Sequence, residues 1–204
     1  MGRRSDHSRD EIRKMAIEAA AKIVETEGFK SLTARKVAAK IGYTVGTLYH
    51  VFRNFDDIVI HLNARTIDEM AVLIQKSVKK KRSAETRIRT MAGVYVNFAT
   101  EHPDRWRLVF EHQAPRGLPT PELMKVRRDV LFEMVAENLR ELSPNHITQE
   151  IDHTATALWS GIHGICILAL TGKLYLGGAF SMVKLIDTLI DSVLNEFRRT
   201  QAAD

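Results

Sequence analysis

The 204-residue sequence has a single cysteine, Cys166, so thiol chemistry can contribute little to its structure. One cysteine excludes an intramolecular disulfide and any zinc site of the multi-cysteine finger or ribbon type. Residues 1–9 are polar and basic and lack the apolar run of a secretory signal. We therefore expect the protein to work in a reducing, cytoplasmic setting.

Long uncharged stretches are scarce, with one exception at residues 154–172. This stretch has no Asp, Glu, Lys or Arg and is about long enough to cross a membrane. It also contains three glycines and several Thr, Ser and His residues, which make it a poor span. A helix that is apolar all round is more often buried in a soluble protein, so we expect no membrane partner and keep a membrane protein as the least favoured alternative.

Strand signals are lacking, because no alternating β-branched segments bounded by hairpin turns occur. Apolar residues instead recur at helical spacing nearly throughout, which predicts an all-α protein of about nine helices. The first helix should begin at the capping-box pair Ser8 and Glu11 and end at Gly28. After the three N-terminal helices, we expect helices at about residues 56–80, 84–101, 103–113, 120–142, 147–175 and 180–200.

An excess of positive charge is found only in the first quarter of the chain. Residues 1–55 hold 11 of the 30 Lys and Arg residues and 6 of the 25 Asp and Glu residues, which leaves 19 of each sign for the rest. An acidic partner such as nucleic acid therefore fits this quarter. The densest basic cluster, residues 79–82, is interpreted as the solvated polar end of a helix.

Two short helices lie on either side of a glycine turn within this basic quarter. Thr33 is the expected N-cap of the first helix, Gly42 forms the turn, and the second helix begins at about Thr44. This arrangement is typical of a helix-turn-helix, whose second helix enters the major groove of DNA. We therefore expect a three-helix DNA-binding head at residues 1–55 and a larger helical body at residues 56–204.

The first turns of the second short helix provide the groups expected to meet DNA. Threonine hydroxyls hydrogen-bond to bases or phosphates, and valine and threonine methyl groups pack against thymine methyl groups. Gly46 permits close approach of the backbone, while Tyr49 and His50 are placed to donate to phosphates. The expected DNA-binding residues are Thr33, Arg35, Thr44, Val45, Gly46, Thr47, Tyr49, His50 and Arg53.

Purely structural roles remain the alternative for several of these side chains. Tyr49 neighbours apolar residues and has packing in the head as its alternative role. Arg35 and Lys36 have the alternative of a solvated helix face. The positive field expected around the head comes from Arg3, Arg4, Arg9, Arg35, Lys36 and Arg53.

The head carries a glycine, two-helix and aromatic pattern made of Gly28-Phe29, Leu32-Thr33, Val37-Ala38 and residues 41–52, IGYTVGTLYHVF. This pattern resembles the DNA-binding domain of the TetR family of bacterial transcriptional regulators. The resemblance implies a homodimeric repressor whose first three helices bind a palindromic operator in double-stranded DNA. It also implies that the C-terminal helices bind a small-molecule effector and form the dimer.

The sequence departs from the family pattern at several positions. Phe55 stands where the family commonly has a lysine that grips phosphate at the start of the fourth helix. Thr44 keeps the hydroxyl of the usual serine, Val45 replaces a frequent basic or polar residue, and Val51 replaces an aromatic residue or histidine. A weaker resemblance covers residues 158–164, LWSGIHG, which are similar to the Trp-x-x-x-His-Gly segment of one class of TetR C-terminal domains.

The last two expected helices have more apolar surface than one core needs. We expect residues 147–175 and 180–200 to pair with a second copy of the chain as a four-helix interface. The alternative is a monomer in which both helices are deeply buried. The two apolar stripes of the last helix are Phe180, Val183, Ile186, Ile190, Val193 and Phe197, and Met182, Leu185, Leu189 and Leu194.

Candidate effector-binding residues are aromatic or polar-tipped side chains on the middle helices, because ligand pockets are mostly apolar with a few orienting polar groups. Trp159 and His163 lie four residues apart and share a helix face. Each candidate also has a core role as its alternative. The candidates are Tyr95, Phe98, Trp106, Phe110, Trp159, His163 and Cys166.

No pattern in the sequence favours an enzyme, a cofactor or a metal site. The row Glu133, Glu137 and Glu141 is interpreted as a solvated helix face. Two hypotheses follow: a DNA-binding regulator, or an α-helical small-molecule-binding or enzymatic protein with a vestigial head. Phe55 is the feature that supports the second.

Overall fold

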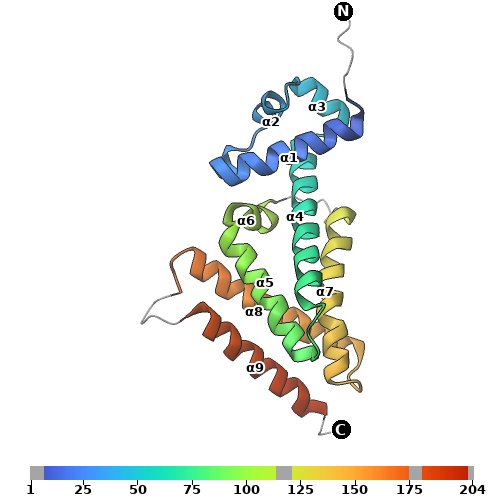
Figure 1. Cartoon of the computed structure of the whole chain (residues 1–204), viewed down its shortest axis with the longest axis vertical. Coiled ribbons are helices and arrows are strands. Elements are labelled where there is room, and N and C mark those ends of the chain that lie inside the picture. Colours follow the sequence, from blue (N-terminus) through green and yellow to red (C-terminus); the bar gives the residue numbers. More distant parts are fainter. Residues whose placement is uncertain (1–6, 114–120, 175–180, 202–204) are drawn as a thin grey trace, which may run out of the picture. The chain divides into compact units, whose positions relative to one another are not determined.

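The computed structural model describes residues 7–113, 121–174 and 181–201, so Arg3, Arg4 and Phe180 lie outside the described residues. Within the described ranges the chain forms nine α-helices, one short 3-10 helix and no strand, which confirms the all-α prediction (Figure 1). The α-helices are α1 (Arg9–Glu27), α2 (Ala34–Lys40), α3 (Val45–Val51), α4 (Phe55–Val78), α5 (Ala84–Glu101), α6 (Pro103–Glu111), α7 (Glu122–Leu142), α8 (Thr148–Leu170) and α9 (Met182–Gln201), and the 3-10 helix is η1 (Phe29–Ser31).

The ends of the first helices follow local signals in the sequence. At the start of α1, the backbone N–H of Ser8 donates to the Glu11 carboxylate at 2.7 Å, and the Glu11 N–H donates to the Ser8 hydroxyl at 3.3 Å. Helix α1 ends at Gly28, and the turn after α2 contains Gly42; their φ angles are 79° and 74°. Both values lie in the left-handed region that favours glycine, so the expected capping box and glycine turns are confirmed.

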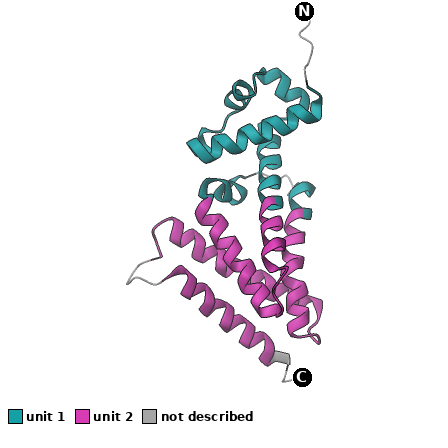
Figure 2. Ribbon diagram, in the orientation of Figure 1, with its two compact units in different colours: residues 1–68, 102–126 teal, residues 69–101, 127–204 magenta. Residues whose placement is uncertain are grey.

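The helices form two compact units (Figure 2). The first consists of Met1–Asp68 and His102–Val126, and the second of Glu69–Glu101 and Arg127–Asp204. The first unit thus contains the expected head together with the start of α4 and all of α6. The functional boundary after residue 55 stays a prediction, because the units are defined by packing alone.

The core of the first unit is formed by the apolar faces of α1, α2, α3 and the start of α4. Leu108 of α6 joins this core with 5% of its surface exposed. Helix α6 is also fastened by polar contacts: the guanidinium of Arg105 donates to the Glu25 carboxylate and to the Thr66 hydroxyl, each at 3.2 Å. In addition, the side-chain amide of Asn63 donates to the Leu108 carbonyl at 3.1 Å. Helix α6 is therefore an integral part of the unit that carries the head.

The core of the second unit includes the packing of α8 against α5 and α9. One face of α8 is buried, and α9 approaches its backbone closely at Gly161. A Cβ atom at this position would lie 2.5 Å from Cδ2 of Leu189. Gly164, by contrast, has open space around its α-carbon within the described residues of the single chain. Gly161 is therefore a point of close approach between α8 and α9 within one chain.

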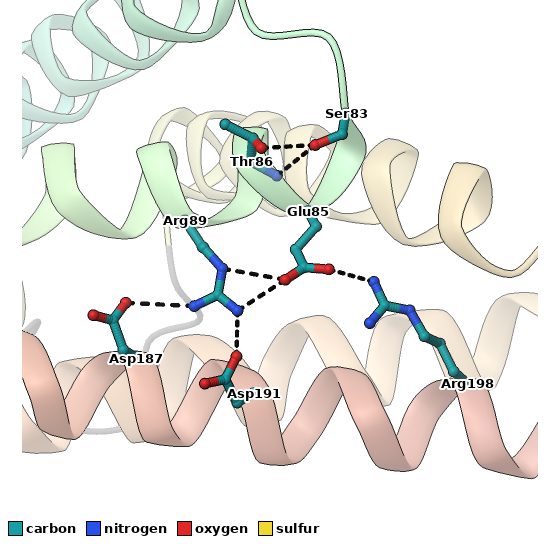
Figure 3. A network of polar contacts seen from close by, with 7 residues as sticks. All are labelled: Ser83, Glu85, Thr86, Arg89, Asp187, Asp191 and Arg198. Atoms are coloured by element: carbon teal, nitrogen blue, oxygen red, sulfur yellow. Dashed lines mark hydrogen bonds and ion pairs between the residues drawn. The ribbon is translucent and has the colours of Figure 1, made fainter.

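An ion-pair network joins α5 to α9 in the second unit (Figure 3). The Arg89 guanidinium donates to Glu85 at 2.8 Å, to Asp187 at 3.4 Å, and to Asp191. Arg198 donates to the second oxygen of Glu85. The hydrogen bonds from Arg198 and Arg89 lower the pKa of Glu85, and those to Glu85 and Asp191 raise the pKa of Arg89. These contacts fix one side of α9 on α5.

Helix α8 is long and apolar enough to cross a membrane by length and composition alone, and it is the one helix among the described residues that passes this test. Core helices of soluble proteins pass the same test, so it is weak support for a span. Within the single chain, only 22% of the most apolar 18-residue window is buried. The deep burial expected for this stretch is therefore not reached within one chain.

Candidate functional site

The first turn of α3 is held by its own threonine side chains. The Thr44 hydroxyl caps the helix by accepting from the Thr47 N–H at 3.2 Å, and the two hydroxyl oxygens are hydrogen-bonded at 3.0 Å. Thr44 and Gly46 are exposed, and Thr47 is half-buried. The turn therefore presents hydrogen-bonded hydroxyls to solvent, together with the backbone of Gly46, which has no side chain.

The remaining expected DNA-binding residues are placed unevenly around this turn. Tyr49 is 47% exposed and lies outside the core of the head, so the packing alternative does not describe it. His50, Thr33, Arg35 and Arg53 are also exposed. Val45 is half-buried against the core of the head, which limits the methyl surface that it presents to a base.

The cations of the head differ in whether they form ion pairs with carboxylates of the same chain. The Lys36 ammonium pairs with Glu27 at 2.6 Å, and the Arg53 guanidinium pairs with Asp57 at 3.1 Å. Burial alone would raise the pKa of Asp57, but the backbone and side-chain hydrogen bonds from Arg53 lower it. Arg35 is exposed, and no ion pair is recorded for it among the described residues.

The start of α4 contains Phe55, at the position where the resemblance to the TetR family implies a phosphate-binding lysine. Phe55, at that position, is half-buried against the core of the head. The Asn54 side chain accepts from the Asp57 N–H at 2.8 Å, and the Asp57 carboxylate accepts from the Arg53 N–H at 3.0 Å. Residue 55 thus contributes to packing, and Arg53 is the cation nearest to this helix end in the sequence.

The expected effector-binding residues fall into both units. Trp106 and Phe110 belong to the first unit, where their rings are in edge-to-face contact with centroids 5.2 Å apart. The other five candidates belong to the second unit, where Phe98 and Cys166 are buried. Burial raises the pKa of the Cys166 thiol to about 11, so this group stays protonated near neutral pH.

Three of the candidates in the second unit are in direct contact. The Tyr95 hydroxyl and Nδ1 of His163 are hydrogen-bonded at 2.7 Å, and the Trp159 and His163 rings are stacked with centroids 5.3 Å apart. Sequence reasoning missed a fourth aromatic residue, Phe132 of α7, which lies 5.6 Å from Trp159 between ring centroids. Its apolar helical spacing resembles that of any core residue, so nothing in the sequence singled it out. We call Tyr95, Phe132, Trp159 and His163 the aromatic cluster.

His163 should make the stability of the second unit depend on pH. Burial lowers the pKa of its imidazole below the ordinary value of 6.5. The unfolded state therefore binds the proton more tightly, and stability is lost as pH falls through 6.5 towards the folded-state pKa. We expect wild-type protein to lose more stability between about pH 7.5 and about pH 5.5 than His163→Gln, measured by urea unfolding. Equal losses in the two proteins would contradict this prediction.

No group of three or more His, Cys, Asp or Glu side chains is placed to hold a metal ion in the described part of the chain. The predicted glutamate row on α7 is exposed at Glu133, Glu137 and Glu141. Glu133 pairs with Arg140, and Glu141 pairs with Arg87. The row is thus a solvated face with ion pairs, as expected.

A small head in which the second helix of the helix-turn-helix, α3, is capped and exposed, together with a larger helical unit, is typical of a helix-turn-helix regulator of transcription. Comparison with known families agrees: residues 16–62 match the family described as "Bacterial regulatory proteins, tetR family", and residues 88–193 match "Tetracyclin repressor-like, C-terminal domain". The chain belongs to the TetR family. It is a transcriptional regulator with a helix-turn-helix DNA-binding domain and a ligand-binding C-terminal domain.

Individual relatives support this assignment. A helix-turn-helix transcriptional regulator of Mycobacterium tuberculosis is 26% identical over 161 residues, which cover 78% of this chain and 71% of that protein. A protein of unknown function from Rhodococcus sp. RHA1 has the same fold, with a TM-score of 0.74, 17% identity and coverage of 96% of this chain and 98% of that one. RolR, solved with resorcinol, has a TM-score of 0.66 and 13% identity, with coverage of 96% and 95%.

Proposed function

We propose that the protein is a homodimeric repressor that is released from a palindromic operator by a small-molecule effector. The observation that carries the DNA part is the exposed turn of α3, where the hydroxyls of Thr44 and Thr47 are ordered by capping. Each protomer would place this helix in one major groove, with half-sites one turn or a multiple of it apart, about 34–36 Å per turn. The regulator would act in the cytoplasm by binding, without a catalytic step.

The apolar surface of α8 supports the dimer. The face opposite its buried residues carries small side chains and ends in Leu168, which is 42% exposed in the single chain. Large apolar patches are unusual on soluble monomers. In the proposed dimer, α8 and α9 pair with their copies and cover this face in a four-helix interface. We define the dimer face of α8 as Ala157, Ser160, Gly164 and Leu168.

The aromatic cluster supports an effector site in the second unit. Its rings offer apolar faces, while the Tyr95 hydroxyl and the His163 imidazole offer hydrogen bonds. Because burial lowers the pKa of His163, the imidazole is neutral near pH 7 and suits an uncharged ligand with an aromatic body and a polar group. The resorcinol bound by RolR, a structural neighbour, is of this chemical kind.

Release of DNA requires that the effector binds one conformation more tightly than another, since equal binding shifts no equilibrium. Helices α4 and α7 each supply residues to both units, and α4 is the one that begins directly after the recognition helix α3. We propose that tilting of α4 changes the separation of the two heads in the dimer. The effector would favour the conformation whose heads do not match the operator.

Selection from random DNA tests the operator and the residue roles together. We expect the wild-type dimer to select a palindrome at moderate salt. Replacing Tyr49 with Ala should weaken binding to all sequences, because a phosphate contact carries no sequence information. Replacing Thr44 with Val should change the selected sequence and cost about 1–3 kcal/mol on the original operator.

The outcomes of this selection are distinct. The opposite pattern, in which Tyr49→Ala changes the selected sequence and Thr44→Val weakens all binding equally, would refute the roles given to these residues. Absence of any palindrome in the wild-type selection would refute the operator proposal. Tight binding of a small molecule without DNA affinity would instead favour a ligand-binding protein with a vestigial head.

A further inference from the structure

We propose that residues 7–13, at the start of α1 and just before it, orient the recognition helix α3 and act on DNA binding through it. This inference rests on the proposed DNA-binding role of α3. From the sequence alone, Arg9 is expected only to contribute to the general positive field of the head. In the structure its guanidinium donates to a specific acceptor on the same chain, and two residues nearby in the sequence, His7 and Arg13, have related contacts.

The C-terminal end of α3 receives two arginines from α1. The Arg9 guanidinium donates to the His50 carbonyl at 2.6 Å, and the Arg13 guanidinium donates to the Val51 carbonyl at 3.4 Å. The last carbonyls of a helix lack partners within the helix, and cations there also complement its dipole. These donors therefore satisfy the end of α3 and tie it to α1.

The opposite end of α3 is tied to the same segment. Nδ1 of His7 and the Tyr43 hydroxyl are hydrogen-bonded at 2.8 Å, and the two rings lie edge to face with centroids 6.1 Å apart. Tyr43 immediately precedes Thr44, the N-cap of α3. A stretch of seven residues thus contacts the chain at both ends of the recognition helix. We call His7, Arg9, Arg13 and Tyr43 the α3 clamp.

A clamp of this kind is needed because α3 is short. It has seven residues, of which Leu48 and Val51 are buried in the core of the head. Apolar contacts are non-directional, so these two side chains and the half-buried Val45 hold the helix on the core without fixing its exact orientation. Hydrogen bonds to named carbonyls at one end and to a hydroxyl at the other end fix its direction.

The clamp and a direct phosphate contact have different experimental signatures. Loss of a phosphate contact weakens specific and non-specific binding together and reduces the salt slope of log K by about 1. Loss of helix orientation weakens the specific complex, whereas the phosphate contacts that dominate non-specific binding persist. Arg35 is the matched control for Arg9, because it is an exposed arginine of the same head and has no hydrogen bond or ion pair recorded among the described residues.

The test uses the full-length protein and the selected operator at several salt concentrations. For Arg9→Met we expect a loss of operator affinity of about tenfold, non-specific affinity within about twofold of wild type, and an unchanged salt slope. For Arg35→Met we expect both affinities to fall and the slope to decrease by about 1. A slope change of this size in Arg9→Met, or unchanged operator affinity, would overturn the inference.

A second variant covers the case in which Arg9→Met fails to fold, which thermal unfolding would reveal. Tyr43→Phe removes only the hydroxyl at the other end of the clamp and keeps the ring. We expect a smaller loss of operator affinity, about threefold, again with an unchanged slope. Unchanged operator affinity in a folded Tyr43→Phe protein would then overturn the inference. Failure of the wild-type protein to select any operator would contradict the proposed function and is distinguishable from both results.

Discussion

Trp106→Ala is expected to remove about 3–5 kcal/mol from the free energy of unfolding of the first unit. The Trp106 side chain is 0% exposed, and its ring is in edge-to-face contact with Phe110. Truncation leaves a cavity between α6 and its neighbours, which a close-packed interior fills only in part. Urea unfolding followed by circular dichroism measures this loss as a lower midpoint.

The same variant separates a core role from an effector-binding role for Trp106. We expect Trp106→Phe, which keeps an aromatic ring, to lose less stability than the alanine variant. Ligand binding at the aromatic cluster of the second unit is followed by the fluorescence of Trp159, the one tryptophan left in these variants. Unchanged stability of Trp106→Ala together with loss of effector binding would contradict the core assignment.

Leu168→Glu is expected to raise the dissociation constant of the proposed dimer about 1000-fold. Leu168 lies on the dimer face of α8 and is 42% exposed in the single chain. Two-fold symmetry places two new carboxylates in the interface, and each unpaired buried charge costs about 2 kcal/mol or more. Because about 1.4 kcal/mol corresponds to a factor of ten, the two together give this change. Analytical ultracentrifugation over a dilution series measures it.

Val72→Glu is the matched control for the dimer variant. Val72 of α4 is 45% exposed, close to the exposure of Leu168, and it lies outside the dimer face. We expect this variant to have the dissociation constant of the wild-type protein. A dimer that tolerates Leu168→Glu, or that is disrupted equally by Val72→Glu, would refute the assignment of α8 to the interface.

Sequence predicted well those features that depend on near neighbours in the chain. The capping pair Ser8 and Glu11 and the turns at Gly28 and Gly42 were predictable because each signal acts within a few residues. The family assignment was predictable for a related reason. The helix-turn-helix pattern is itself a local run of residues, and the match to the TetR family at residues 16–62 confirms it.

Sequence could not predict contacts that close over long distances. Trp106 and Phe110 shared the apolar character of the other effector candidates, yet α6 packs in the unit that contains α1. Arg9 resembled any other cation of the head, because its acceptor at His50 lies 41 positions away. These contacts depend on how helices that are far apart in the sequence pack together, and the spacing of residues along the chain does not predict that packing.

The hydrogen bond between the Thr44 and Thr47 hydroxyls should affect which pairs of bases the operator contains. One of the two hydroxyls donates its proton to the other, so a base that engages one hydroxyl changes what the other can donate or accept. In the proposed complex, the base preferences at the positions facing these two residues should then be correlated. The reason is the one that makes the free-energy effects of substitutions at contacting residues non-additive. We therefore expect a binding model that couples these two base-pair positions to rank the regulator's genomic sites better than a model that treats every position independently.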